Sequence, residues 1–215
     1  MYKCINLLLI TCLILVGCNK AKESENFINY GEISGGVYTN NYFNMSIDVP
    51  ENWVVQSQAA QKELLELGGD LLSGGDENFK NVLDESQKRI VNMFAFFKFE
   101  VGAPVEFNPN IISIAEKITD FPGVKSGNDY LFHTKKQLQA GQIGYEFPNE
   151  IYVKNISGVS FDVMPMQTSI GTFTVYQEYY ATKINDYALT FTLSYSTDEE
   201  QDELNEIVDT LKFSE

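Results

Sequence analysis

The sequence predicts an α+β fold in which helices sandwich a largely antiparallel β-sheet. The main evidence is three strand-like segments near the C-terminus, 159–168, 172–183 and 187–196, the last of which alternates in side-chain direction at the period of a β-strand. Turn-forming residues at 169–171 and at Asn185–Asp186 join them into an antiparallel meander. One face of the last segment is expected to be buried under a helix that begins at the capping box of Thr197 and Glu200. The apolar stripe of this helix is Leu204, Ile207, Val208 and Leu211.

The first third of the mature chain predicts a hairpin and two helices. Residues 37–49 alternate in polarity and are expected to turn at Asn40–Asn41. A helix is predicted from Gln58, with an end weakened by Gly68–Gly69 and Gly74–Gly75. Its apolar residues recur every three or four positions at Ala60, Leu64, Leu67 and Leu71. A second helix is expected over 76–88, with Asp76 as its N-cap.

Two strands and a helix are predicted before the meander. Residues 90–100 are rich in phenylalanine and apolar on both sides, which is typical of a central strand. Residues 111–118 fit a helix or a strand by period, and their short length and β-branched isoleucines favour a strand. A helix is then expected from about Asn128 to Ala140, where Gly141 ends it.

The N-terminus predicts export. Lys3 precedes an apolar run from Ile5 to Val16 that is shorter than the roughly 20 residues of a membrane-spanning helix. Leu15, Val16, Gly17 and Cys18 resemble the lipobox of bacterial lipoproteins. The resemblance implies cleavage before Cys18 and lipidation of its thiol; the alternative is an ordinary secretory signal with an incidental cysteine.

These features divide the chain into three parts. Residues 1–17 are expected to be a lipoprotein signal peptide, and residues 18–35 a polar, lipidated tether. Residues 36–215 are expected to form a single α+β domain in which order begins near Val37. The lipid on Cys18 would attach the domain to the exported side of a bacterial cell-envelope membrane.

Composition narrows the classes of partner. The chain has 15 basic and 30 acidic residues and a formal net charge of −15, which disfavours nucleic acid and anionic lipid headgroups. Cationic partners are favoured, although an acidic surface also serves solubility. Cys4 and Cys12 would leave with the signal peptide, so disulfides and cysteine-ligated metals are not expected.

Several residues resemble the PsbP-like group, the fold of the extrinsic P subunit of photosystem II and of many bacterial lipoproteins. They are Tyr38, Phe43, Met45, Ile47, Val49, Pro50 and Trp53, the segment Asn108–Ile111, and the ending from Tyr179 to Phe213. The resemblance implies a PsbP-like α+β domain over most of residues 36–215. It implies no photosynthetic role, because no metal or partner residues of that subunit match here.

The sequence carries little reaction chemistry. His133 is the only histidine, which excludes a two-histidine zinc site, and no metal or other cofactor is expected. A triad of His133 and Asp129 with Ser126 or Ser160 lacks the Gly-x-Ser-x-Gly turn of a nucleophilic serine and is rejected. Asp70, Asp76 and Glu77 lack the spacing of a calcium loop.

One constellation could bind a ligand. Tyr176, Glu178 and Tyr180 alternate along a predicted strand and should share a face, where aromatic rings and a carboxylate could hold a sugar or a cation. The alternative is an ordinary outer sheet face, because tyrosine is common in strands.

Two functions follow as hypotheses. The first is a lipid-anchored, non-catalytic binding or scaffold module at the outer face of a bacterial membrane, with an envelope protein as a possible partner. The second is a surface hydrolase or carbohydrate-binding protein that uses paired carboxylates, which would require a pocket with two acids.

Overall fold

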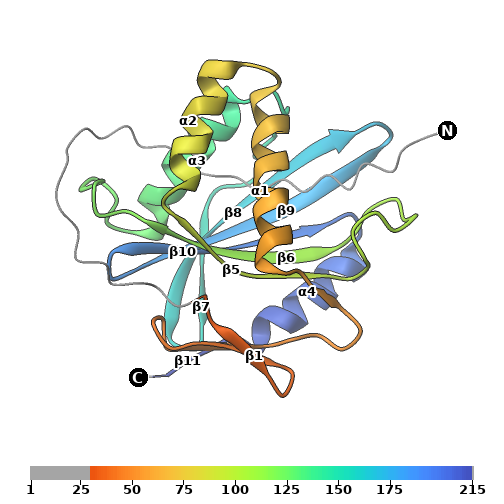
Figure 1. The fold of residues 1–215 in the computed structure, drawn as a ribbon, viewed down its shortest axis with the longest axis vertical. Helices are drawn as coiled ribbons and strands as arrows, with labels where there is room; N and C mark the ends of the chain where they lie inside the picture. Colours follow the sequence, from red (N-terminus) through yellow and green to blue (C-terminus); the bar gives the residue numbers. More distant parts are fainter. Residues whose placement is uncertain (1–29, 215) are drawn as a thin grey trace.

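The computed structural model describes residues 30–214 and places four helices and eleven strands there (Figure 1). The helices are α1 (Gln58–Ser73), α2 (Glu77–Gln87), α3 (Gly127–Ala140) and α4 (Asp198–Asp209). A small antiparallel sheet has the order β1 (Glu32–Ser34), β2 (Val37–Asn40), β3 (Met45–Asp48) and β11 (Lys212–Phe213). A larger antiparallel sheet has the order β4 (Val54–Val55), β5 (Ile90–Phe97), β6 (Asn110–Lys117), β10 (Tyr187–Tyr195), β9 (Phe173–Ile184), β8 (Val159–Ile170) and β7 (Tyr152–Ile156).

Helices cover both faces of the larger sheet, so the predicted α+β sandwich is confirmed. In Figure 1, α1, α2 and α3 lie on one side of it, and α4 lies on the other side together with the small sheet. The apolar side chains of α4 pack with the β2–β3 hairpin in one core, whereas α2 and α3 contribute to a second core. All nine residues of β10 are buried. The sequence predicted that only one face of this strand is buried. The other face is buried as well, because α1–α3 cover it.

The elements with strong local signals were predicted correctly. The 37–49 hairpin forms β2 and β3, which pair through a turn after Asn40. Asp76 caps α2, and the Thr197 hydroxyl and Glu200 carboxylate form the expected capping box of α4. The segment predicted at 111–118 forms the strand β6 (Asn110–Lys117), as its β-branched residues favoured.

Several features differ from the sequence prediction, including two unpredicted short strands, β4 and β11, and the 46% exposure of Leu67, which was expected on the apolar face of the first helix. β1 lies within the range assigned to the tether and pairs with β2, so order begins before Val37. β7 was not predicted, and it pairs with β8 at the edge of the larger sheet. Gly68–Gly69 do not end α1, which continues to Ser73, and the second glycine pair of the prediction supplies its C-cap, Gly74, in the left-handed conformation. A Cβ on Gly69 would lie 3.2 Å from Nε2 of Gln87, so the missing side chain lets α1 pack closely against α2.

The predicted signal peptide, Cys18 and most of the predicted tether fall in residues 1–29, outside the described part of the chain. Within residues 30–214, none of the helices combines the length and apolar character needed to cross a membrane.

Candidate ligand-binding site

The strand register of the meander brings polar and aromatic residues into two adjacent rows on the α4 side of the sheet. In one row, Glu178 of β9 lies opposite Pro165 of β8 and Leu193 of β10. In the next row, Tyr176 of β9 lies opposite Gln167 of β8 and Tyr195 of β10. Side chains two residues apart on a strand share a face, so both rows point to the same side.

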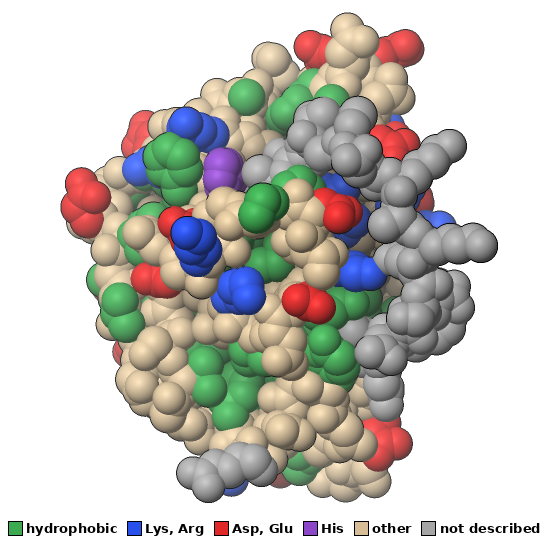
Figure 2. All heavy atoms as spheres, turned by 90° about the vertical axis from the view of Figure 1, so that its left-hand side faces the viewer, with side chains coloured by type: hydrophobic (Ala, Val, Ile, Leu, Met, Phe, Trp, Pro, Cys, Tyr) green, Lys and Arg blue, Asp and Glu red, His purple; other side chains and the backbone are tan. Residues whose placement is uncertain are grey.

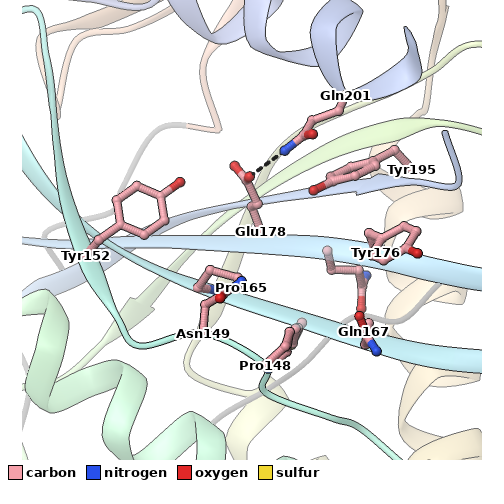
Figure 3. Close-up of a pocket in the computed structure, with 11 residues that line it drawn as sticks. Pro148, Asn149, Tyr152, Pro165, Gln167, Tyr176, Glu178, Tyr195 and Gln201 are labelled. Atoms are coloured by element: carbon pink, nitrogen blue, oxygen red, sulfur yellow. Dashed lines mark hydrogen bonds between the residues drawn. The ribbon is translucent and has the colours of Figure 1, made fainter. Parts of the chain in front are cut away.

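These rows form one wall of a cavity of about 440 Å³, the Glu178 pocket (Figure 3). Gln201 of α4 lies on one side of Glu178, and Pro148 and Asn149, which precede β7, lie on the other. The complete lining is Pro148, Asn149, Tyr152, Pro165, Met166, Gln167, Tyr176, Gln177, Glu178, Tyr195 and Gln201. The volume falls within the range of roughly 300 to 1,000 Å³ that is usual for small-molecule sites.

Glu178 is held rigidly at this pocket. Its side chain lies at the boundary of the core, with the whole residue 7% exposed. The Tyr180 hydroxyl donates a hydrogen bond to Oε2 at 2.7 Å, and Nε2 of Gln201 donates one to Oε1 at 2.8 Å. The alternative of an ordinary outer sheet face is therefore wrong for Glu178, because α4 and the end of the meander enclose it.

The two predicted tyrosines have different roles. Tyr180 is buried in the core and offers its hydroxyl to Glu178, while Nζ of Lys154 lies 5.6 Å from the centre of its ring. Tyr176 is 39% exposed and stacks on Tyr195, with ring centres 5.8 Å apart and planes 21° apart. The structure thus brings all three predicted residues together, but it leaves only Tyr176 and Glu178 to line the pocket.

The tyrosine hydroxyls around Glu178 stay protonated at physiological pH. Burial raises the pKa of Tyr152, Tyr180 and Tyr195, and the negative charge of Glu178 raises each of them further. In Figure 3 the hydroxyls of Tyr152 and Tyr195 point toward Glu178 from opposite sides. The pocket therefore combines one carboxylate with neutral phenols and neutral amides.

Sequence reasoning missed several lining residues. Tyr152 belongs to β7, a strand that was not predicted, and Gln201 belongs to a helix whose N-terminal half was considered only for its cap. Tyr195 carried a usable signal, because the predicted turn at Asn185–Asp186 fixes the register that places it opposite Tyr176.

The other candidates of the sequence analysis have structural roles. The Ser126 hydroxyl caps α3 and also donates to Oδ2 of Asp129, whose pKa is lowered by this bond and, more strongly, by the backbone N–H of Lys125. The imidazole of His133 is in edge contact with the ring of Phe132. Ser160 lies exposed on β8. These positions do not assemble a nucleophile and base.

Two of the acidic residues near the Gly-Gly turns also have structural roles. Asp70 forms an ion pair with Lys80 at 2.8 Å, and Asp76 caps α2. Over residues 30–214, no group of three or more histidine, cysteine, aspartate or glutamate side chains is arranged to hold a metal ion.

A second buried carboxylate lies away from the pocket lining. Glu116 of β6 accepts a hydrogen bond from the Tyr130 hydroxyl at 3.0 Å and forms an ion pair with Arg89 at 3.2 Å. Burial raises the pKa of Glu116 to about 7, against the lowering by the Arg89 guanidinium and the Tyr130 hydroxyl. Sequence reasoning had no signal for this residue, because a single glutamate between isoleucine-rich strand positions and a lysine looks like an ordinary strand end.

No protein-family model and no curated protein sequence matches the chain. Solved structures do resemble it. The cyanobacterial PsbP of Synechocystis sp. PCC 6803 is 13% identical, with a TM-score of 0.48, over 86% of this chain and 98% of that chain. LpqN of Mycobacterium tuberculosis, which is involved in cell envelope biogenesis, is 14% identical, with a TM-score of 0.45, over 78% of this chain and 82% of that chain. A Pseudomonas aeruginosa protein of unknown function is 13% identical, with a TM-score of 0.41, over 54% of this chain and 78% of that chain.

Proposed function

We propose that this protein is a lipid-anchored, non-catalytic binding module at the outer face of a bacterial membrane, and that the Glu178 pocket is its ligand site. The observation that carries the binding role is the pocket itself, in which one fixed carboxylate faces a cavity with tyrosine and amide walls. The lipobox-like residues Leu15–Cys18 support the anchor.

The composition of the pocket favours binding over hydrolysis. Hydrolysis of a glycosidic bond by the usual mechanism needs two carboxyl groups about 5 to 10 Å apart, one of them able to donate a proton. Glu178 is the only acid among the residues that line the pocket. Both of its oxygens already accept a hydrogen bond from a neutral donor, which suits a fixed contact better than a proton-transfer role.

The surface supports a small-ligand or protein partner in preference to nucleic acid. Figure 2 shows one face of the molecule, on which basic side chains are interspersed with acidic and hydrophobic ones instead of forming a basic patch. Together with the net charge of −15, this arrangement supplies little attraction for a phosphate backbone.

The anchor is tested by fractionation of cells that produce the full chain. The wild type is expected in the membrane fraction, and the Cys18→Ala variant in the soluble fraction with an unchanged melting temperature, because its folded domain is untouched. Cys12→Ala is the matched control, since it removes a thiol from the apolar run and should leave the protein on the membrane. A Cys18→Ala protein that stays on the membrane would refute the anchor.

The non-catalytic role has its own test. The purified wild-type chain and a Glu178→Gln variant are compared on a panel of chromogenic glycosides and esters. Equal background rates are expected for both proteins. Turnover by the wild type that the variant loses would refute the proposal and favour the hydrolase.

A further inference from the structure

We infer that the Glu178 pocket binds an organic cation with N–H donors, such as the primary ammonium group of an amine or of a lysyl side chain. This inference rests on the proposed function, because it assigns a ligand class to the same pocket. It is carried by a buried carboxylate without an ion-pair partner among residues 30–214, by the tyrosine faces around it and by the size of the cavity.

The carboxylate lacks a counter-charge. Among residues 30–214, the ion pairs of the structure do not include Glu178, and neither lysine nor arginine lines the pocket. Lys154 is near this region, but its Nζ lies over the Tyr180 ring and donates to Oδ1 of Asn205 at 3.2 Å. A buried charge is costly unless it is paired, so a cationic ligand would remove a cost that the free protein bears.

The carboxylate also has unused hydrogen-bonding capacity. An ionised carboxylate offers about four acceptor positions, and Tyr180 and Gln201 occupy two of those on Glu178. These two donors come from β9 and α4 and fix the plane of the carboxylate before any ligand arrives. The remaining positions suit N–H donors, and a charged donor makes the stronger bond.

The walls are suited to a cation as well. Tyr152 and Tyr176 are 42% and 39% exposed, so their ring surfaces are accessible, and the stacked pair of Tyr176 and Tyr195 extends the aromatic surface. A ring face attracts a cation within about 6 Å of its centre. Lys154 shows that this part of the sheet already holds one ammonium group over a tyrosine ring.

The cavity favours an organic cation over a bare metal ion. Calcium and magnesium are bound by about six or more oxygen ligands, usually including several carboxylates. The lining supplies one carboxylate, and its volume of about 440 Å³ accommodates a ligand of several heavy atoms. Pro148 and Pro165 provide apolar contact for the carbon chain of an amine.

The test is isothermal titration calorimetry of the full chain in a non-ionic detergent. The probe is 1,5-diaminopentane, and 1,5-pentanediol is the neutral analogue of equal length. The diamine is expected to bind at least tenfold more tightly than the diol. Glu178→Gln should weaken diamine binding by at least about tenfold, which corresponds to the loss of a charge-assisted hydrogen bond.

Two further variants keep the test decisive if Glu178→Gln folds poorly. Tyr176→Leu changes a half-exposed side chain and should weaken diamine binding several-fold. Glu206→Gln removes an exposed carboxylate from α4 and should leave the affinity unchanged. Circular dichroism checks that each variant is folded.

The outcomes separate this inference from the proposed function. Equal diamine affinity in folded Glu178→Gln, equal affinity for the diol, or no diamine binding at millimolar concentration overturns the cation assignment. Binding of N-acetylglucosamine that depends on Tyr176, without diamine binding, also overturns it and leaves a binding module in place. Failure of the proposed function would instead appear as Glu178-dependent turnover, which refutes the non-catalytic role, or as a Cys18→Ala protein that stays on the membrane, which refutes the anchor.

Discussion

Replacement of Glu116 by glutamine should make the protein less sensitive to pH. Glu116 is only 1% exposed, between the Arg89 guanidinium and the Tyr130 hydroxyl. Burial raises its pKa from 4.5 to about 7 in the folded state. In the unfolded chain the side chain is in water and ionises near this ordinary value.

The sign of the effect follows from proton binding. Between about pH 4.5 and pH 7, Glu116 is protonated in the folded protein and ionised in the unfolded chain. The unfolded state therefore binds fewer protons, and the free energy of unfolding falls as the pH rises through this window. A shift of about 2.5 pKa units corresponds to roughly 3 kcal/mol. Glutamine does not ionise, so the free energy of unfolding of Glu116→Gln should not fall in this way as the pH rises.

The measurement is urea unfolding of wild type and variant at intervals from pH 4.5 to pH 7.5. The amide also changes the hydrogen bonds to Tyr130 and Arg89, which adds an offset that does not depend on pH. The informative quantity is therefore the free energy of unfolding of the variant minus that of the wild type, followed as a function of pH. This difference is expected to rise by up to about 3 kcal/mol from pH 4.5 to pH 7.

Glu63→Gln, which replaces an exposed acid on α1, controls for the removal of one acidic side chain. A difference for Glu116→Gln that stays flat or falls between pH 4.5 and pH 7.5 would refute the reasoning. It would mean that the Arg89 ion pair keeps Glu116 ionised in spite of its burial.

Three further substitutions test the packing. Gly127→Ala should destabilise the protein by about 1 to 3 kcal/mol and so lower its melting temperature, because the added Cβ would lie 2.1 Å from the backbone oxygen of Ala181. An unchanged melting temperature would contradict this contact. Thr197→Ala removes the cap of α4 and should cost about 1 kcal/mol in urea unfolding, and a cost near zero would argue against the cap. Leu204→Ala, in the core, should lower the free energy of unfolding by about 2 to 5 kcal/mol. The control Leu67→Ala, at an exposed position, should change it by about 0.5 kcal/mol or less. Similar values for the two variants would contradict the packing of α4.

The fold was predictable where the signal is local. The capping box at Thr197, the apolar stripe of α4 and the alternation of the 37–49 hairpin each need only a few neighbouring residues to be recognised. β1 and β7 have no such signal, because they are three and five residues long and mostly exposed. Their hydrogen bonds to β2 and β8 define them, and pairing with a partner strand cannot be deduced from so short a stretch.

The candidate site was predictable only in part, for a related reason. Strand alternation correctly placed Tyr176, Glu178 and Tyr180 on one face, but it could not show which of them a helix would cover. Tyr180 belongs to the core that includes the apolar side chains of α4, whereas Tyr176 lies outside that core and lines the pocket. The hydrogen bond from Gln201 to Glu178 spans 23 residues and depends on the same docking.

The two buried carboxylates show what these local rules leave unexplained. Both lie on inner strands of the larger sheet, where a charged side chain is costly. Glu116 has the Arg89 guanidinium beside it, so its burial is explained within the fold and bears on stability. Glu178 is fixed by two neutral donors and faces a cavity, without a cationic partner among residues 30–214. A buried carboxylate that faces a cavity, with no ion-pair partner in the described part of the fold, is the feature expected of a binding site, whereas the Arg89 pair gives Glu116 a role within the fold.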